Sequence, residues 1–460
     1  MNPITSKIEK KLRQITGEKN FSRQKEDLVC YAYDATRRFF MPGAVVFPQN
    51  SDQVSKILAL ASENGIPVTP RGAGSGMSGG SVAVKEGLVM VMTGLGRILA
   101  VDADNFTATV QPGVITGVFQ KAVAEQGLFY PPDPSSADFS TLGGNLAECA
   151  GGPRAVKYGV TRDYVLGLEV VLPYGEIIRT GVKTAKGVVG YDLTRLIIGS
   201  EGTLGVITEI TLRLLARPEE VRTLSAEFDS MDKAARAVAA VMRSGITPCA
   251  LEYMDKNAIS CVKSYQDAGL SEEAEALLLI EADGTPEQAR EAVDRIAGVL
   301  KENGAAKIET AQTAEEVQRL WKARKAVSPA LYTYGPDKIN EDIVIPRSRL
   351  PEMVEKIRVL GEKTGLTMVS FGHAGDGNIH FNVMYDSSRP EQAVAARKAV
   401  EEVFGYTLEL GGTISGEHGV GIAKAPYMNR EISPEALSLM RRIKKAFDPA
   451  GILNPGKMLM

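Results

Sequence analysis

Residues 70–80 read PRGAGSGMSGG and contain the glycine pattern G-x-G-x-x-G at Gly74, Gly76 and Gly79. In a Rossmann dinucleotide-binding fold this pattern joins a strand to a helix, because the helix N-terminus receives the pyrophosphate. Here the following residues, SVAVKEGLVMVMTGL at 81–95, alternate and are rich in β-branched side chains, so they predict a strand. The pattern therefore indicates a different fold.

The same loop is still suited to a phosphate ligand. Successive backbone N–H groups of a glycine-rich turn can bind an anion without a helix, and Arg71 adds a positive charge at the loop entrance. The alternative is a plain surface hairpin. Two more glycine-rich segments, PPDPSSADFSTLGGNLAECAGGPRAVKYG at 131–159 and GSEGTLGVITEITLRL at 199–214, favour the ligand. Their small residues allow close backbone approach to a flat ring, which indicates an extended dinucleotide.

The composition predicts a globular protein and limits its partners. The chain has 460 residues, which suggests about three structural units, or two large ones that share a core. Lys plus Arg total 53 and Asp plus Glu total 56, a net charge of −3, and no basic stripe stands out, which argues against nucleic acid as a partner. No apolar run approaches the roughly 20 residues of a membrane-spanning helix. The charged N-terminus lacks a secretory signal, so we expect a cytoplasmic protein, with membrane attachment through a partner left open.

The four cysteines give no sign of a metal cluster. Cys30, Cys149, Cys249 and Cys261 are far apart and form no C-x-x-C pair. This spacing argues against an iron–sulfur cluster or zinc ribbon within the chain and predicts reduced thiols in the core.

The hydrophobic pattern predicts an α+β protein. Residues 51–64 have apolar side chains at helical spacing before Gly65, and 87–114 and 165–181 read as strands joined by tight turns. From about 220 to 310, helices and strands alternate without glycine-rich loops. This part predicts an α+β cap in which helices cover one face of an antiparallel sheet.

All three histidines lie in two glycine-rich motifs, GHAGDGNIHFN at 372–382 and SGEHGVG at 415–421. Strands on either side of the turn at Asp376-Gly377 predict a hairpin. A two-residue turn would place His373 directly opposite His380, so that both imidazoles could bind one metal ion. Glu417 would add a carboxylate, which suits Zn, Mn or Fe, and the neighbouring His418 would be free to act as a base. The alternative is a polar hydrogen-bond network around a turn.

The three glycine-rich segments, with NPGKM at 454–458, resemble the FAD domain of the vanillyl-alcohol oxidase and p-cresol methylhydroxylase (PCMH) superfamily. The resemblance covers about residues 40–217 and implies FAD bound around its pyrophosphate. Some members attach FAD through a histidine, and because the FAD loops contain none here, we predict noncovalent FAD. The implied cofactor contacts are Arg71, Gly72, Ala73, Gly74, Ser75, Gly76, Met77, Pro132, Asp133, Thr141, Gly143, Gly144, Asn145, Gly151, Gly152, Tyr158, Gly202, Val206, Ile207 and Asn454.

The histidine motifs and the C-terminal AFDPAGILNPGKM resemble the FAD-dependent 2-hydroxy-acid dehydrogenases, which include glycolate oxidase flavoprotein subunits and D-lactate dehydrogenases. The resemblance implies His373, His380 and Glu417 as metal ligands, His418 as base, and Asn382 in the substrate pocket. The pattern W-x-x-R places Arg324 on the substrate carboxylate, where a guanidinium can pair through two hydrogen bonds. It also implies an FAD-binding domain of PCMH type over 1–217, an inserted substrate or cap domain over 218–415, and a C-terminal segment over 416–460 that returns to the FAD domain.

One departure bears on the substrate. The D-2-hydroxyglutarate dehydrogenases carry a lysine six residues before the proline that is Pro346 here, and this chain has Asn340. The difference favours D-lactate or glycolate over a dicarboxylic acid.

The expected reaction is oxidation of a short D-2-hydroxy acid to the 2-oxo acid, with hydride transfer to flavin N5. Reoxidation of FAD would need an iron–sulfur subunit, an electron-transfer flavoprotein or a quinone. The alternatives are a D-2-hydroxyglutarate dehydrogenase, an alkylglycerone-phosphate synthase type of reaction without net oxidation, a flavin electron-transfer subunit, and a metallohydrolase that uses only the His/Glu site.

Overall fold

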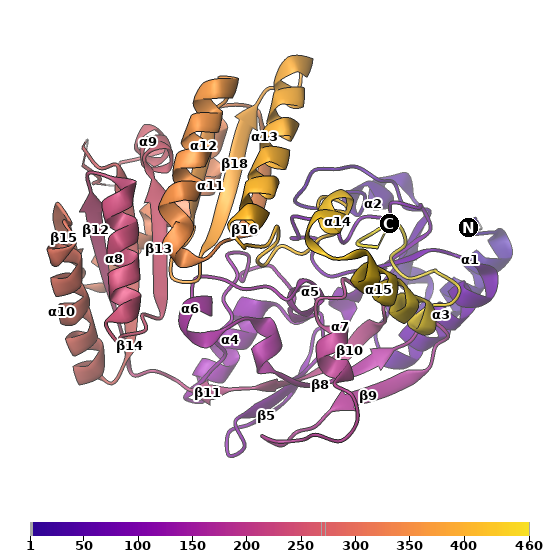
Figure 1. Ribbon diagram of the computed structural model, residues 1–460. Helices are drawn as coiled ribbons and strands as arrows, with labels where there is room; N and C mark the ends of the chain where they lie inside the picture. Colours follow the sequence, from indigo (N-terminus) through magenta and orange to yellow (C-terminus); the bar gives the residue numbers. More distant parts are fainter. Residues whose placement is uncertain (1–2, 268, 272, 460) are drawn as a thin grey trace. The chain divides into compact units, whose positions relative to one another are not determined.

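The computed structural model describes residues 3–267, 269–271 and 273–459, whose helices and strands are drawn in Figure 1. They form two compact units. Unit 1 comprises Met1–Gly151, Val160–Arg217 and Glu417–Met460, and unit 2 comprises Gly152–Gly159 and Pro218–Gly416. Within the described ranges, no helix combines the length and apolar character needed to cross a membrane.

Unit 1 is built on small sheets. One has the strand order β1-β2-β4-β3, with β2 and β3 parallel to β4; a second, β5-β6-β10-β8-β9, is antiparallel; β7 pairs with β11. The strands are β1 (Phe21–Ser22), β2 (Ala44–Val46), β3 (Val68–Arg71), β4 (Leu88–Val91), β5 (Ile98–Asp102), β6 (Thr107–Val110), β7 (Leu128–Phe129), β8 (Val165–Val171), β9 (Ile177–Gly181), β10 (Val206–Arg213) and β11 (Leu215–Ala216). The helices are α1 (Ser6–Thr16), α2 (Lys25–Cys30), α3 (Ser51–Asn64), α4 (Thr116–Ala124), α5 (Leu142–Glu148), α7 (Leu193–Ile197), α14 (Met428–Glu431) and α15 (Pro434–Phe447).

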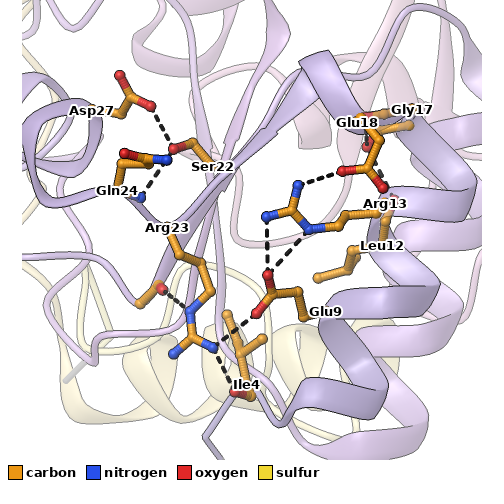
Figure 2. A network of polar contacts seen from close by, with 12 residues as sticks. Ile4, Glu9, Leu12, Arg13, Gly17, Glu18, Ser22, Arg23, Gln24 and Asp27 are labelled. Atoms are coloured by element: carbon orange, nitrogen blue, oxygen red, sulfur yellow. Dashed lines mark hydrogen bonds and ion pairs between the residues drawn. The ribbon is translucent and has the colours of Figure 1, made fainter.

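Apolar packing holds the N-terminal helix α1 in unit 1. Its Ile8 and Leu12 are buried in the core cluster that includes residues of β2, α3 and β4. Figure 2 shows the polar contacts around the same helix, where Arg13 pairs with Glu9 at 3.0 Å and with Glu18 at 2.7 Å. These ion pairs are partly exposed to water and therefore add little stability. The buried side chains account for most of the attachment.

The order of elements in unit 1 confirms several sequence predictions. Helix α3 ends before Gly65, which adopts φ 62° as a left-handed C-cap. β5 and β6 pair as the predicted hairpin. The element that follows the loop at 70–80 is strand β4 and not a helix, so the Rossmann arrangement is absent there.

Unit 2 contains a seven-stranded antiparallel sheet of order β15-β12-β14-β13-β17-β18-β16. Its strands are β12 (Glu220–Phe228), β13 (Ala250–Asp255), β14 (Ala276–Gly284), β15 (Lys307–Thr310), β16 (Asp337–Val344), β17 (Met368–His373) and β18 (Asn378–Tyr385). Its helices are α6 (Ala155–Tyr158), α8 (Met231–Arg243), α9 (Lys256–Tyr265), α10 (Pro286–Glu302), α11 (Ala314–Ala330), α12 (Leu350–Thr364) and α13 (Pro390–Glu409).

Helices cover both faces of this sheet, so the prediction of one-sided cover is wrong. α9 and α11 pack on the face that carries Met254, Leu277 and Phe371. α8, α12 and α13 lie on the other face, toward the viewer in Figure 1. The reason is visible in β14, where residues 276–282 are all buried. Such a continuous apolar run is typical of a strand that is covered on both sides.

The hairpin that carries two of the histidines has a longer turn than predicted. Its Cα partners are Phe371 with His380 and His373 with Asn378. The predicted direct pairing of His373 with His380 is therefore wrong. The His373 carbonyl accepts hydrogen bonds from the N–H groups of Asp376 and Gly377, which closes a four-residue turn. Because the register differs by two residues, both histidines still lie on one face of the sheet.

Asp255 connects this hairpin to its neighbours. Its Oδ1 accepts the Ala258 N–H at 2.7 Å at the start of α9, and its Oδ2 accepts the Ser370 N–H at 2.7 Å and the Ser370 hydroxyl at 2.9 Å. Burial raises the pKa of Asp255 to about 6, despite these hydrogen bonds. The raised pKa means that the folded state holds the proton more tightly than the unfolded chain.

We predict that Asp255→Ala lowers the free energy of unfolding by about 2–4 kcal/mol, because buried N–H groups lose their acceptor. The stabilisation by Asp255 is complete below the unfolded pKa and decreases as the pH rises through about 6. The loss should therefore be larger at acidic than at neutral pH in thermal unfolding followed by circular dichroism. Asp232→Ala, an exposed change in α8, is the control and should have little effect at either pH. An equal loss at both pH values would contradict the expected titration.

Candidate functional site

Arg71 ends β3 at the entrance of the first glycine loop and is almost fully buried. Its guanidinium donates to the Ser81 carbonyl at 3.3 Å and lies over the Tyr31 ring at 5.8 Å. Burial lowers the pKa of Arg71. Within the described ranges, no carboxylate forms an ion pair with it, so the loop holds a buried cation that can receive an anion.

Glycine at position 74 is required by this arrangement. Gly74 has φ +73°, and a Cβ atom there would lie 2.1 Å from Arg71 Nη2. Gly72 similarly allows close packing, because its Cβ would lie 2.2 Å from Thr141 Oγ1. The structure thus brings the first two glycine-rich segments together at Thr141, which is the N-cap of α5 and accepts the Gly144 N–H at 3.2 Å.

The third glycine-rich segment and the C-terminus meet the first loop at Gly80. The Gly80 carbonyl accepts hydrogen bonds from Asn454 Nδ2 and from Lys457 Nζ, both at 2.8 Å. Asn454 also donates to the Glu201 carbonyl at 2.7 Å. The Glu201 carboxylate accepts the N–H groups of Val420 and Gly421, each at 2.7 Å. These contacts join four segments that are far apart in the sequence.

Lys457 is a residue that the sequence reasoning missed. It is buried, and this burial lowers its pKa to about 8. The signal in the sequence is its position in the motif NPGKM, three residues after Asn454.

Most of the predicted cofactor contacts lie in unit 1, and two lie in unit 2. Gly152 and Tyr158 belong to unit 2, where the Tyr158 hydroxyl donates to Asp283 Oδ2 at 2.7 Å. The predicted residues in unit 1 are Arg71, Gly72, Ala73, Gly74, Ser75, Gly76, Met77, Pro132, Asp133, Thr141, Gly143, Gly144, Asn145, Gly151, Gly202, Val206, Ile207 and Asn454. The close backbone packing, the buried Arg71 and the buried, unpaired Ser78 Oγ fit the needs of a dinucleotide pyrophosphate.

In unit 2, His373 and His380 are buried on the face of the sheet that α9 and α11 cover. Their Nε2 atoms lie 3.4 Å apart. Two nitrogen ligands at about 2.1 Å from a tetrahedral zinc ion are about 3.4 Å apart. The spacing of the two imidazoles therefore fits a common metal ion.

Glu417 follows Gly416, whose N–H donates to the buried carboxylate of Asp342 at 2.8 Å. His373 and His380 belong to unit 2, whereas Glu417 is the first residue of the C-terminal segment of unit 1. The assignment of Glu417 as a third ligand stays a prediction, and His418 is the next residue in the chain, half-buried in a glycine-rich loop.

Arg324, the predicted substrate anchor, pairs with a carboxylate of the protein. Its Nε donates to Glu252 Oε2 at 2.8 Å, its Nη2 lies 2.7 Å from the same oxygen, and its guanidinium stacks on Phe371 at 4.7 Å. Glu252 also contacts His373 Nδ1 at 2.5 Å. Burial opposes ionisation of Glu252, but His373 and Arg324 outweigh it and lower its pKa. The sequence reasoning missed Glu252, although a carboxylate in the buried strand ALEYMD is itself unusual.

Asn382 lies near this group on the same face of the sheet. Its Oδ1 accepts a hydrogen bond from Asn340 Nδ2 at 2.7 Å, and its Nδ2 donates to the His380 carbonyl at 3.2 Å. The residue that stood out as a departure in the sequence, Asn340, is therefore the cross-strand partner of the predicted substrate residue.

Two family models match the chain. "FAD binding domain" matches residues 42–181, and "FAD linked oxidases, C-terminal domain" matches residues 217–458. Together they support FAD binding and an oxidoreductase.

Similar proteins span nearly the whole chain. The chain is 45% identical to glycolate oxidase subunit GlcD of Bacillus subtilis, over 99% of this chain and 97% of that protein. It is 38% identical to GlcD of Escherichia coli K12, over 94% and 87%, and 36% identical to the D-lactate dehydrogenase of Anaerostipes hadrus, over 91% and 89%.

Solved structures share the fold at low sequence identity. p-Cresol methylhydroxylase with bound substrate superposes with a TM-score of 0.81 at 19% identity, over 98% of this chain and 96% of that one. An alkyldihydroxyacetonephosphate synthase gives a TM-score of 0.77 at 20% identity, over 99% and 87%. The chain therefore belongs to the FAD-linked oxidase family that includes GlcD and the D-lactate dehydrogenases, and has the p-cresol methylhydroxylase type of FAD-binding fold.

Proposed function

We propose that this protein oxidises a short D-2-hydroxy acid, D-lactate or glycolate, to the 2-oxo acid with noncovalently bound FAD. The names of its relatives support this class of substrate. The observation that carries the proposal is the pair of Nε2 atoms 3.4 Å apart, on the same buried face as Arg324. A cation and a guanidinium together suit a molecule with a hydroxyl next to a carboxylate.

The residues have distinct roles in this proposal. His373, His380 and Glu417 hold a divalent cation, Zn, Mn or Fe, which when bound lowers the pKa of the substrate hydroxyl. Arg324 binds the substrate carboxylate, and Asn382 contacts the substrate. His418 accepts the hydroxyl proton at a ring nitrogen. FAD, when bound by the glycine loops of unit 1, supplies the hydride acceptor at N5.

Asn340 supports a monocarboxylic substrate. It stands where the D-2-hydroxyglutarate dehydrogenases resembled by the sequence carry a lysine, and its amide is paired with Asn382. A neutral amide gives a second carboxylate no counter-charge. D-2-Hydroxyglutarate is the alternative substrate.

A separate acceptor would reoxidise the flavin. Two of the relatives are named as subunits of glycolate oxidase, and the cysteines of this chain have no cluster-binding spacing. We propose an iron–sulfur subunit, an electron-transfer flavoprotein or a quinone as the acceptor, and a cytoplasmic location for this chain. A role as a flavin electron-transfer subunit without its own substrate is the competing function.

We predict that D-lactate or glycolate alone bleaches the flavin absorbance of the purified protein under anaerobic conditions. L-Lactate and D-2-hydroxyglutarate should reduce it much more slowly. A chelator should slow the reaction, because the substrate hydroxyl loses its polarising cation. A flavin that stays oxidised with every hydroxy acid would favour the electron-transfer function.

His418→Ala provides the matched variant for this assay. It should retain its yellow flavin and its metal, while the rate of flavin reduction falls by about 10²–10⁴-fold. Wild-type rates in this variant would reject His418 as the base.

The metal assignment predicts that His380→Ala loses most of its bound divalent metal, as measured by mass spectrometry of the purified protein. Removal of one of three ligands leaves an incomplete coordination sphere. His418→Ala is the control, since it removes the one histidine that is not assigned as a ligand. Metal retained in His380→Ala and lost in His418→Ala would reverse the two roles.

The FAD assignment predicts that Gly74→Ala reduces the flavin content of the purified protein. A Cβ at this position would displace the Arg71 guanidinium, which lies 2.1 Å away. Gly127→Ala is a matched control because Gly127 has the same φ of +73° with open space around it. It carries the same backbone strain, roughly 1–2 kcal/mol, without the clash. Equal flavin loss in both variants would show that strain, and not Arg71, is responsible.

A further inference from the structure

Glu252 occupies a position where a carboxylate is costly. It lies in β13, inside the seven-stranded sheet, and it is completely buried. A buried charge is stable only when its neighbours compensate for the lost water. Its Cα partner on β17 is His373, and residues that face each other on adjacent antiparallel strands project their side chains to the same side.

The two oxygens of Glu252 have different partners. Oε1 lies 2.5 Å from His373 Nδ1. Oε2 accepts from Arg324 Nε at 2.8 Å and lies 2.7 Å from Arg324 Nη2. One carboxylate therefore contacts both an imidazole assigned to the cation and the guanidinium assigned to the substrate.

The contact with Oε1 decides the tautomer of His373. An ionised carboxylate only accepts hydrogen bonds, so Nδ1 carries the proton. The lone pair of the neutral ring is then on Nε2, which is the atom that lies 3.4 Å from His380 Nε2. This is the tautomer that a metal ion requires.

The contact with Oε2 fixes Arg324. Two of the guanidinium nitrogens face Glu252, while the ring of Phe371 supports the plane from one side at 4.7 Å. The negative charge of Glu252 also offsets the repulsion between Arg324 and a bound cation.

From this geometry we infer that Glu252 is a positioning residue that orients His373 for the cation and Arg324 for the acid at the same time. The inference rests on the proposed function, which assigns the cation and the acid to these two side chains. It predicts that a single change at Glu252 weakens both binding events, although Glu252 itself touches neither ligand.

Glu252→Gln tests this role with almost no change in volume. His373 and Arg324 contact different oxygens of Glu252, and in Gln one of these two positions becomes a donating NH₂ group, so only one of the two contacts keeps its acceptor. Titration of the metal-depleted, FAD-loaded protein with Mn²⁺ alone should show about 10–100-fold weaker binding in the variant. The KM for D-lactate should rise as well, because Arg324 loses its anchor.

Glu281→Gln is the matched control. Glu281 is a buried carboxylate in the neighbouring strand β14, and it accepts hydrogen bonds from Trp321 Nε1 and Thr223 Oγ1. This variant should keep the wild-type affinity for Mn²⁺. Equal weakening in both variants would mean that any buried carboxylate of the sheet has this effect, and would overturn the inference.

A measurement on the wild-type protein keeps the inference testable if Glu252→Gln does not fold. The chain has three histidines, so ¹⁵N-histidine labelling gives few signals. In the metal-free protein, His373 should show a protonated Nδ1 and an unprotonated Nε2. The opposite tautomer would overturn the inference. A folded Glu252→Gln variant with unchanged Mn²⁺ affinity and unchanged KM would also overturn the inference, although the proposed function would still stand. Wild-type protein that binds no Mn²⁺ and is not reduced by hydroxy acids would overturn both.

Discussion

A buried ionisable side chain loses its contacts with water, and hydrogen bonds within the protein replace them at Glu201 and Lys457 in unit 1 and at Glu252 in unit 2. In unit 1, the buried Glu201 carboxylate accepts hydrogen bonds from two backbone N–H groups, and Lys457 donates to a backbone carbonyl and to a side-chain amide oxygen. In unit 2, Glu252 is met by Arg324 and His373. The hydrogen bonds of each of these buried side chains connect segments that are far apart in the sequence.

The two units position their buried polar side chains with different backbone structures. Unit 1 uses glycine-rich loops. At Gly72 and Gly74, the Thr141 and Arg71 side chains lie so close to the backbone that a Cβ atom would clash with them. Unit 2 uses the regular alternation of a sheet, which sends Glu252, His373 and His380 to one face. Loops that follow the shape of a ligand suit a long cofactor, whereas strands suit ligands that must be held at fixed angles.

Local rules predicted much of the fold from the sequence. The cap of α3 at Gly65, the hairpin of β5 and β6, and the strand after the glycine loop all depend on residues close in the chain. The errors have equally physical causes. The turn after His373 is longer than the Asp-Gly signal indicates because the His373 carbonyl binds two N–H groups. The prediction that helices cover only one face of the sheet was wrong because β14 is buried on both faces.

The sequence by itself determined the residue types of the candidate site: glycine loops with Arg71, and three histidines and Glu417 in two motifs. It also placed His373 and His380 on one face, because a shift of two residues leaves the alternation of a strand unchanged. Only the tertiary structure decided which carboxylate stands opposite His373 and which guanidinium shares it. Glu252 and Arg324 are 72 residues apart, and strand order, which no local pattern specifies, brings them to the same histidine.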